Sequence, residues 1–135
     1  MDIEPLWKRR AVLKIKFITS IKEVGQKVWD QLAYQASPFC HYHFLHALET
    51  SGSVGQNTGW SPQHLVIYQQ NEIVGILPLY KKTHSYGEYV FDFAWANTYR
   101  QYGLLYYPKL VSAIPFTPVT GPRLMLKADI ERDQV

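Results

Sequence analysis

The sequence predicts an α/β protein of the α+β type, in which helices flank a mixed, mostly antiparallel sheet. Three patterns carry this prediction: apolar and basic residues alternate over 11–18, apolar residues recur at helical spacing over 20–35, and two apolar β-branched runs lie within 65–80. With 135 residues, 47% of them hydrophobic and 19% charged, the chain has the size and composition of a globular domain. We therefore expect a single domain over residues 1–135.

The formal net charge of +3 comes entirely from residues 1–16, and the rest of the chain sums to zero. A short basic arm near a terminus, here residues 1–10, is usually just solvated. DNA is therefore not an expected partner.

Cysteine content and apolar runs bear on location. Cys40 is the single cysteine, so no intrachain disulfide can form, which is typical of a reducing compartment. No apolar signal-peptide segment follows the basic start, and the longest uncharged apolar run, 110–122, contains three prolines and is too short to cross a bilayer. We expect a cytoplasmic protein without a membrane span.

The first strand is predicted over 11–18, where the alternation has the period of a half-buried strand. Ser20 followed by Glu23 is a capping-box signature, and a first helix is predicted to run to about Gln35 despite Gly25 inside it.

A second, short helix is predicted after Ser37, because Pro38 is suited to a first helical position. Gly52 lies where a C-terminal glycine would let the chain turn away. The glycine- and hydroxyl-rich segment 51–61 is predicted to be a loop.

Residues 65–68 and 73–80 are predicted to form an antiparallel hairpin through the polar connection 69–72, and Pro78 indicates an edge or a bulge near its end. Ten aromatic residues then crowd into 80–107.

Within that aromatic segment a helix is predicted from Asp92, as an acidic cap, to Tyr102, before Gly103. A last strand is predicted over 110–116, followed by a proline-rich turn. The polar end, 127–135, is expected to be a loose tail that could begin a helix.

A histidine-rich segment raises the question of a metal site. Cys40, His41, His43 and His46 are metal-type ligands at close spacing, but in a helix only His43 and His46 share a face. The favoured interpretation is an ordinary polar helix face, and no metal is predicted.

Several short sequence motifs resemble those of a known family. They are SGSVGQNTGW at 51–60, PQHL at 62–65, VGILPLYKK at 74–82, HSYGEYVFD at 84–92, YPKL at 107–110 and PFTPVTGPRL at 115–124. Together they resemble the bacterial peptidoglycan biosynthesis/recognition family, which is related to the Fem aminoacyltransferases and to GNAT acyltransferases. The predicted order of strand, two helices, hairpin and further strand is similar to the first half of the GNAT layout.

The resemblance implies acyl or aminoacyl transfer to an amine of a peptidoglycan precursor or another acceptor. Members of the family are longer, and no glycine-rich phosphate-binding motif occurs in the 135 residues. We therefore expect an incomplete, N-terminal half of a GNAT/Fem-like fold that is inactive alone and contains no cofactor. In a full-length protein, acyl-CoA or aminoacyl-tRNA would be the donor.

The segment 84–92 offers the candidate catalytic groups that the resemblance calls for. An acceptor amine must lose a proton, and His84 or Glu88 could accept it. Tyr86 and Tyr89 would suit a sugar or muropeptide. The alternative is that Glu88 and Asp92 cap a turn and a helix while the tyrosines fill core edges.

Lys109 and Arg123 flank the predicted last strand and could orient a phosphate or carboxylate, and Thr117 offers a hydroxyl on a rigid turn. The alternative is solvated surface charge.

The sequence is compatible with two functions. The first is the N-terminal part of an acyltransferase, and the second is a non-catalytic binding or assembly module for a cell-wall precursor. An exposed sheet edge also predicts a homo-oligomer.

Overall fold

A computed structural model of the chain describes residues 12–135, so the basic arm predicted over 1–10 and the first residue of the predicted strand lie outside the described residues. The strands form two sheets, one ordered β1-β3-β4-β7 and the other β2-β5-β6. Their bounds are Leu13–Ile18 (β1), Trp60–Pro62 (β2), His64–Gln69 (β3), Glu72–Leu77 (β4), Tyr80–Lys82 (β5), Lys109–Val111 (β6) and Met125–Leu126 (β7). Every strand pair is antiparallel, and the predicted α+β class is confirmed.

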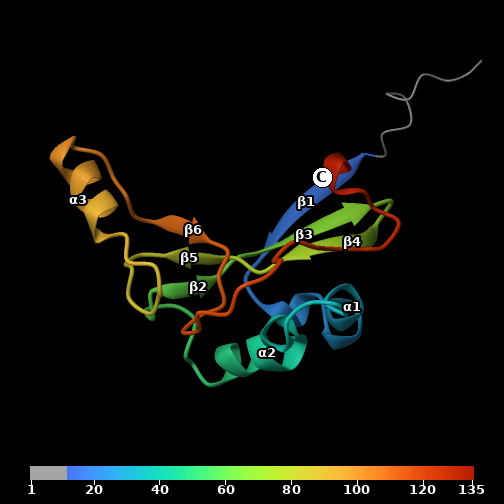
Figure 1. The fold of residues 1–135 in the computed structure, drawn as a ribbon. Coiled ribbons are helices and arrows are strands. Elements are labelled where there is room, and N and C mark those ends of the chain that lie inside the picture. Colours follow the sequence, from blue (N-terminus) through green and yellow to red (C-terminus); the bar gives the residue numbers. More distant parts are fainter. Residues whose placement is uncertain (1–11) are drawn as a thin grey trace, which may run out of the picture.

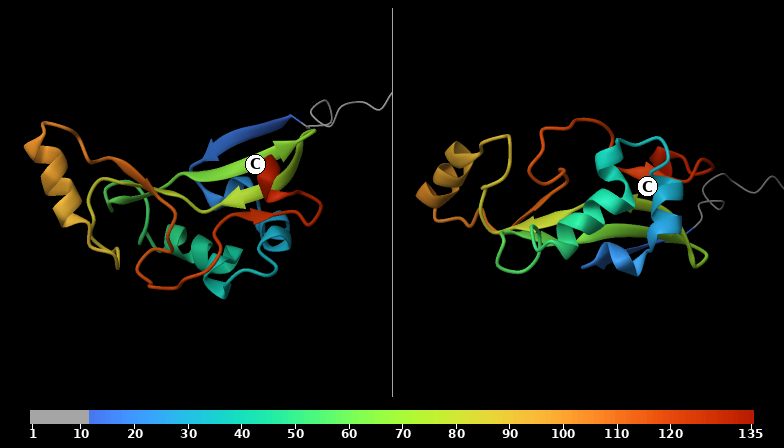
Figure 2. Two further views of the ribbon diagram at one scale, coloured as in Figure 1. Left: turned by 45° about the horizontal axis from the view of Figure 1, so that its top comes forward. Right: turned by 90° about the horizontal axis from the view of Figure 1, so that it is seen from below.

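Three α-helices accompany the sheets: α1 (Gln26–Leu32), α2 (Tyr42–Thr50) and α3 (Phe93–Gln101). Helices α1 and α2 lie together against one face of the four-stranded sheet (Figure 1). Helix α3 lies at the far end of the molecule, beyond the three-stranded sheet, in every view (Figures 1 and 2). Within residues 12–135 no helix is long and apolar enough to cross a bilayer.

The single helix predicted over 20–35 is wrong in its continuity. A short 3-10 turn spans Ile21–Glu23, and α1 then begins at Gln26. Gly25, between them, has a φ of 84°, which side-chain-bearing residues avoid and which no α-helix contains. The cap at Ser20 is present, since its hydroxyl accepts the Lys22 N–H at 3.3 Å.

The predicted second helix is confirmed as a 3-10 turn at Pro38–Cys40 followed by α2. The loop predicted over 51–61 ends at Gly59, because β2 begins at the next residue. The predicted hairpin is also confirmed. Gln70 and Asn71, both at positive φ, form its two-residue turn between β3 and β4.

The end of the predicted strand 73–80 needs correction. Strand β4 stops at Leu77, and the chain crosses through Pro78 into β5 of the other sheet. Buried His64 holds this crossing, because its Nδ1 accepts the Leu79 N–H at 3.1 Å. Proline cannot donate to a sheet ladder, which is why the strand ends there.

The main core lies between the four-stranded sheet and helices α1 and α2. Trp29 and Leu45 of the helices are fully buried against Val66 of β3 and Ile76 of β4. A bulge between Ile67 and Tyr68 shifts the register of the hairpin, and a smaller cluster forms from Ile67, Val74 and Ile130.

The last part of the chain also differs from its prediction. The strand predicted over 110–116 is shorter, because β6 ends at Val111 and the chain then turns. Ser112 donates a hydrogen bond to the Pro78 carbonyl at 3.1 Å, which joins this turn to the crossing between the sheets. Beyond β7, Ile130 is buried and a 3-10 turn spans Arg132–Gln134.

Candidate functional site

The site is built on the loop that follows β5. Lys82 is fully buried, with its Nζ 3.8 Å from the centre of a Trp60 ring and 2.7 Å from the Tyr86 carbonyl oxygen, to which it donates. Trp60 Nε1 donates to the same carbonyl at 3.2 Å. Two donors therefore fix the loop at Tyr86 beside the edge of the indole ring.

Burial lowers the pKa of Lys82 to about 8, although the negative charge of Glu88 opposes the shift. Lys82 and Tyr80 share one face of β5, since alternate residues of a strand point the same way. The sequence carried this signal in the alternation across 80–82, yet Lys82 was not among the predicted site residues.

A buried polar network lies beside this loop and joins it to β6. Lys109 Nζ donates to Glu88 Oε1 at 3.0 Å and also contacts an Asp92 carboxylate oxygen. Ser85 and Tyr106 donate to the same carboxylate, and Ser85 and Tyr107 share a further hydrogen bond.

Ionisation of this network follows from its contacts. Burial would raise the pKa of Asp92, but the hydrogen bonds from Lys109, Ser85 and Tyr106 outweigh it and hold the pKa at about 2. Burial likewise opposes the charged form of Lys109, yet its two carboxylate partners, Asp92 and Glu88, raise its pKa. At neutral pH the network therefore contains one ammonium group and ionised Asp92.

Asp92 does not act as the predicted helix cap, because its side chain makes no capping hydrogen bond to α3. It turns inward to Lys109 instead. An aspartate before a helix looks the same in sequence whether it caps the helix or joins a network, so the sequence could not separate the two roles.

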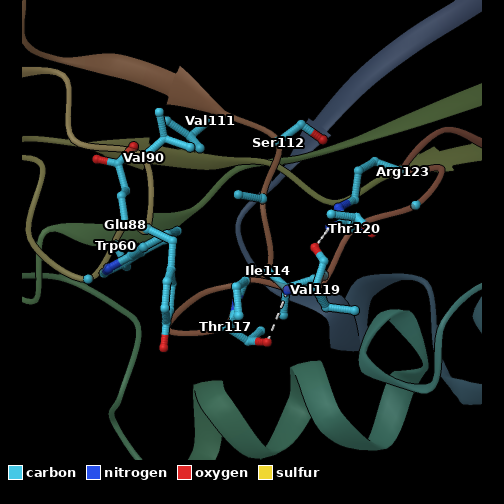
Figure 3. Close-up of a pocket in the computed structure, with 15 residues that line it drawn as sticks. Trp60, Glu88, Val90, Val111, Ser112, Ile114, Thr117, Val119, Thr120 and Arg123 are labelled. Atoms are coloured by element: carbon cyan, nitrogen blue, oxygen red, sulfur yellow. Dashed lines mark hydrogen bonds between the residues drawn. The ribbon is translucent and has the colours of Figure 1, made fainter.

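A pocket of about 490 Å³ opens next to the network, between the loop after β5 and the turn after β6. Figure 3 shows Glu88 and Trp60 on one side of it and Arg123 with Thr120 on the other. Val111, Ile114 and Val119 supply an apolar surface between the two sides.

Glu88 is an acidic residue in the lining of this pocket. Its side chain is only 10% exposed, and its Oε1 pairs with Lys109. Its Oε2 is buried and has no hydrogen-bond partner within residues 12–135. A buried carboxylate oxygen without a donor is costly, so a ligand that brings an N–H or O–H group to it would stabilise the site.

The guanidinium group of Arg123 uses some of its donors in contacts within the protein. One guanidinium nitrogen donates to the Val119 carbonyl, and Nη1 lies 3.9 Å from the buried Cys40 sulfur. A guanidinium has five N–H donors, which leaves donors for an anionic ligand group. Thr117 lies in the same wall, and its Oγ1 accepts the Val119 N–H at 3.3 Å.

The structure brings together four of the predicted site residues at the pocket: Glu88, Tyr89, Thr117 and Arg123. Lys109 contacts the pocket through Glu88. His84 and Tyr86 are not among the lining residues, and the His84 ring instead packs on Gly59, where a Cβ atom would lie 2.1 Å from its Nε2.

The histidine-rich segment is spread over separate contacts. His43 lies 2.8 Å from the Gln26 amide, His46 stacks on Tyr42, and Cys40 is buried. In the described part of the chain no three histidine, cysteine or acidic side chains gather as metal ligands would.

A model of the FemAB-like family, described as peptidoglycan biosynthesis/recognition, matches residues 20–135. The chain belongs to the FemAB-like family. No curated protein and no solved structure matches it. Both the pocket and the polar network lie within the part of the chain that the FemAB-like model covers.

Proposed function

We propose that this FemAB-like chain binds the amine-bearing acceptor of an acyl- or aminoacyl-transfer reaction on a peptidoglycan precursor. The observation that carries the proposal is the unpartnered Oε2 of Glu88 in a pocket that also presents Arg123. An acceptor amine or ammonium group would donate to Glu88, and a carboxylate or phosphate of the same ligand would pair with Arg123. Tyr89 would lie against a sugar or peptide portion.

In this reaction the acceptor nitrogen attacks the acyl carbonyl carbon and forms an amide bond, while the thioester or ester bond of the donor breaks. The amine proton passes to Glu88, and the departing thiol or hydroxyl group takes up a proton. Glu88 suits the role of base because it lines the pocket and its Oε2 accepts no hydrogen bond within residues 12–135. His84 stays the second candidate base. The donor would be acyl-CoA or aminoacyl-tRNA in the cytoplasm, and we assign it no site within residues 12–135.

Acceptor binding is tested by calorimetry with a muropeptide that carries a free side-chain amine. Glu88→Gln should weaken binding about tenfold, since a charge-assisted hydrogen bond is lost. Glu72→Gln is the matched control, because Glu72 is exposed and is not among the residues that line the pocket. Equal binding of the two variants, or equal binding of an N-acetylated muropeptide, would contradict the proposal.

The second candidate function is a binding or assembly module without catalysis. It is favoured by the fact that the pocket offers acceptor-type contacts and no glycine-rich phosphate cradle. Labelled acyl-CoA and aminoacyl-tRNA added with the muropeptide separate the two functions. Labelled product supports transfer, whereas muropeptide binding without product supports the module.

We also propose a homo-oligomer through the edge strand β1. Its outer edge pairs with no strand in the described residues, and Ile15 and Phe17 on it are exposed. Exposed edges recruit other chains. Light scattering should give a dimer or larger species that Ile15→Lys converts to a monomer, and a wild-type monomer would contradict this.

A further inference from the structure

The segment 89–107, here called the aromatic arm, carries an apolar surface that the body of the protein does not cover. It contains α3, of which only Ala96 is buried. Phe91 is 75% exposed, Trp95 66% and Leu105 89%. A helix of a soluble domain normally packs an apolar stripe onto a core, and α3 does not.

The position of the arm explains this exposure. Helix α3 projects from the end of the molecule opposite α1 and β1, and both views of Figure 2 show it there. Phe91 and Phe93 stack on each other, with ring centres 5.9 Å apart, rather than on the core. Large exposed apolar side chains gathered on one projecting segment indicate an interaction site.

The exposed charge of the arm is positive. Asp92 is its one acidic residue, and that carboxylate is buried against Lys109. Arg100 is the one basic residue of the arm, is exposed, and has no ion-pair partner within residues 12–135. The arm therefore presents aromatic and leucine side chains with a single positive charge and no exposed carboxylate.

Arg100 also borders a small apolar pocket. This pocket, of about 190 Å³, lies between α3 and the chain that returns to β6, and Ala96, Leu104 and Leu105 line it with Arg100. An apolar pocket beside a guanidinium group suits a lipid, whose acyl chain is apolar and whose phosphate pairs with arginine.

We propose that the aromatic arm docks the protein on the surface of an anionic phospholipid bilayer. Trp95, Phe91 and Leu105 enter the headgroup region, where aromatic side chains are favoured, and Arg100 pairs with a lipid phosphate. The arm lies on the surface and does not span the bilayer. The pocket at Glu88 faces a different ligand, so this inference does not depend on the proposed acceptor binding.

The test is co-sedimentation of the 135-residue chain with vesicles of phosphatidylglycerol, and with vesicles of phosphatidylcholine for comparison. The chain should bind phosphatidylglycerol more tightly, and added salt should weaken that binding. Trp95→Ser should weaken it about tenfold, because an interfacial aromatic anchor is lost. Tyr34→Ser is the matched control, since Tyr34 is 77% exposed but lies after α1 on the body.

Arg100→Gln should weaken binding about fivefold, as expected for one cation at an anionic surface, and Lys22→Gln should not. All four positions are exposed, so circular dichroism should show folded variants. Three results would each overturn the proposal. They are a wild-type chain that stays in solution with phosphatidylglycerol, equal binding by Trp95→Ser and Tyr34→Ser, or a dimer that Trp95→Ser dissociates, which would assign the arm to a second copy. Glu88→Gln should bind vesicles like the wild type.

Discussion

Lys109 Nζ lies 3.0 Å from Glu88 Oε1, whereas the other oxygen of that carboxylate has no partner in the described residues. One strand residue therefore holds a loop carboxylate through one oxygen and leaves the other, buried oxygen without a donor in the described residues. Lys109 also pairs with Asp92, so a single ammonium group forms ion pairs with two buried carboxylates.

Lys109→Met should destabilise the fold by about 3 kcal/mol, because it leaves buried carboxylates without their cation. Urea unfolding measures the change. Lys127→Gln is the control, since Lys127 pairs with Glu72 at 2.7 Å on the exposed surface, and it should change stability little. Similar unfolding of both variants would show that the network at Lys109 is not a stabilising one.

Asp92→Asn should flatten the acid side of the stability profile. The folded pKa of Asp92, about 2, lies below its ordinary value of 3.8, so its contribution is present above about pH 4 and is lost as the pH falls toward 2. The free energy of unfolding measured across this range should fall less steeply in the variant. The same acid slope in both proteins would be evidence against an ionised, hydrogen-bonded Asp92.

The Lys82 ammonium group should make the free energy of unfolding rise with pH at alkaline pH, and Lys82→Met should abolish that rise. The folded pKa of Lys82 is lowered from 10.5 to about 8, so between these values the unfolded chain binds the extra proton and stability from this group rises with pH. The difference in unfolding free energy between wild type and variant isolates this effect from other groups. A difference that stays constant from pH 8 to 10 would contradict the lowered pKa.

Gly87→Ala should be more damaging than Gly103→Ala. Both glycines have positive φ, so each alanine adds backbone strain of about 1 kcal/mol. At Gly87 a Cβ atom would also lie 2.7 Å from Trp60 Nε1 and 2.8 Å from a Phe116 ring carbon, whereas at Gly103 nothing lies within 4 Å. We expect a total cost of about 3 kcal/mol at Gly87, measured by urea unfolding.

Equal cost at the two glycines would mean that the loop shifts away from Trp60 without loss. Relief of the clash with Trp60 moves the loop, and Glu88 is the next residue along it. Gly87→Ala should therefore also weaken muropeptide binding, whereas Gly103→Ala should leave it unchanged.

Local patterns predicted those parts of the fold that neighbouring residues decide. The hairpin turn at Gln70 and Asn71 and the start of the second helix at Pro38 needed no distant contact. Helical spacing on both sides of Gly25 predicts one continuous helix, whereas the positive φ of Gly25 breaks it. The apolar pattern over 73–80 predicts one strand, because it continues across Pro78, where the chain leaves one sheet for the other.

Composition, periodicity and family motifs are present along the chain, and they are enough to predict the α+β class, the FemAB-like kinship and the segments that contain the candidate site. Which of those residues meet depends on the tertiary structure. Lys109 and Glu88 are separated by 21 positions, and Arg123 lies further along, yet β6 and the turn after it bring them to one loop. Burial then turns ordinary charged residues into a fixed network, because a charge removed from water must find a partner, and burial cannot be inferred from residue type alone.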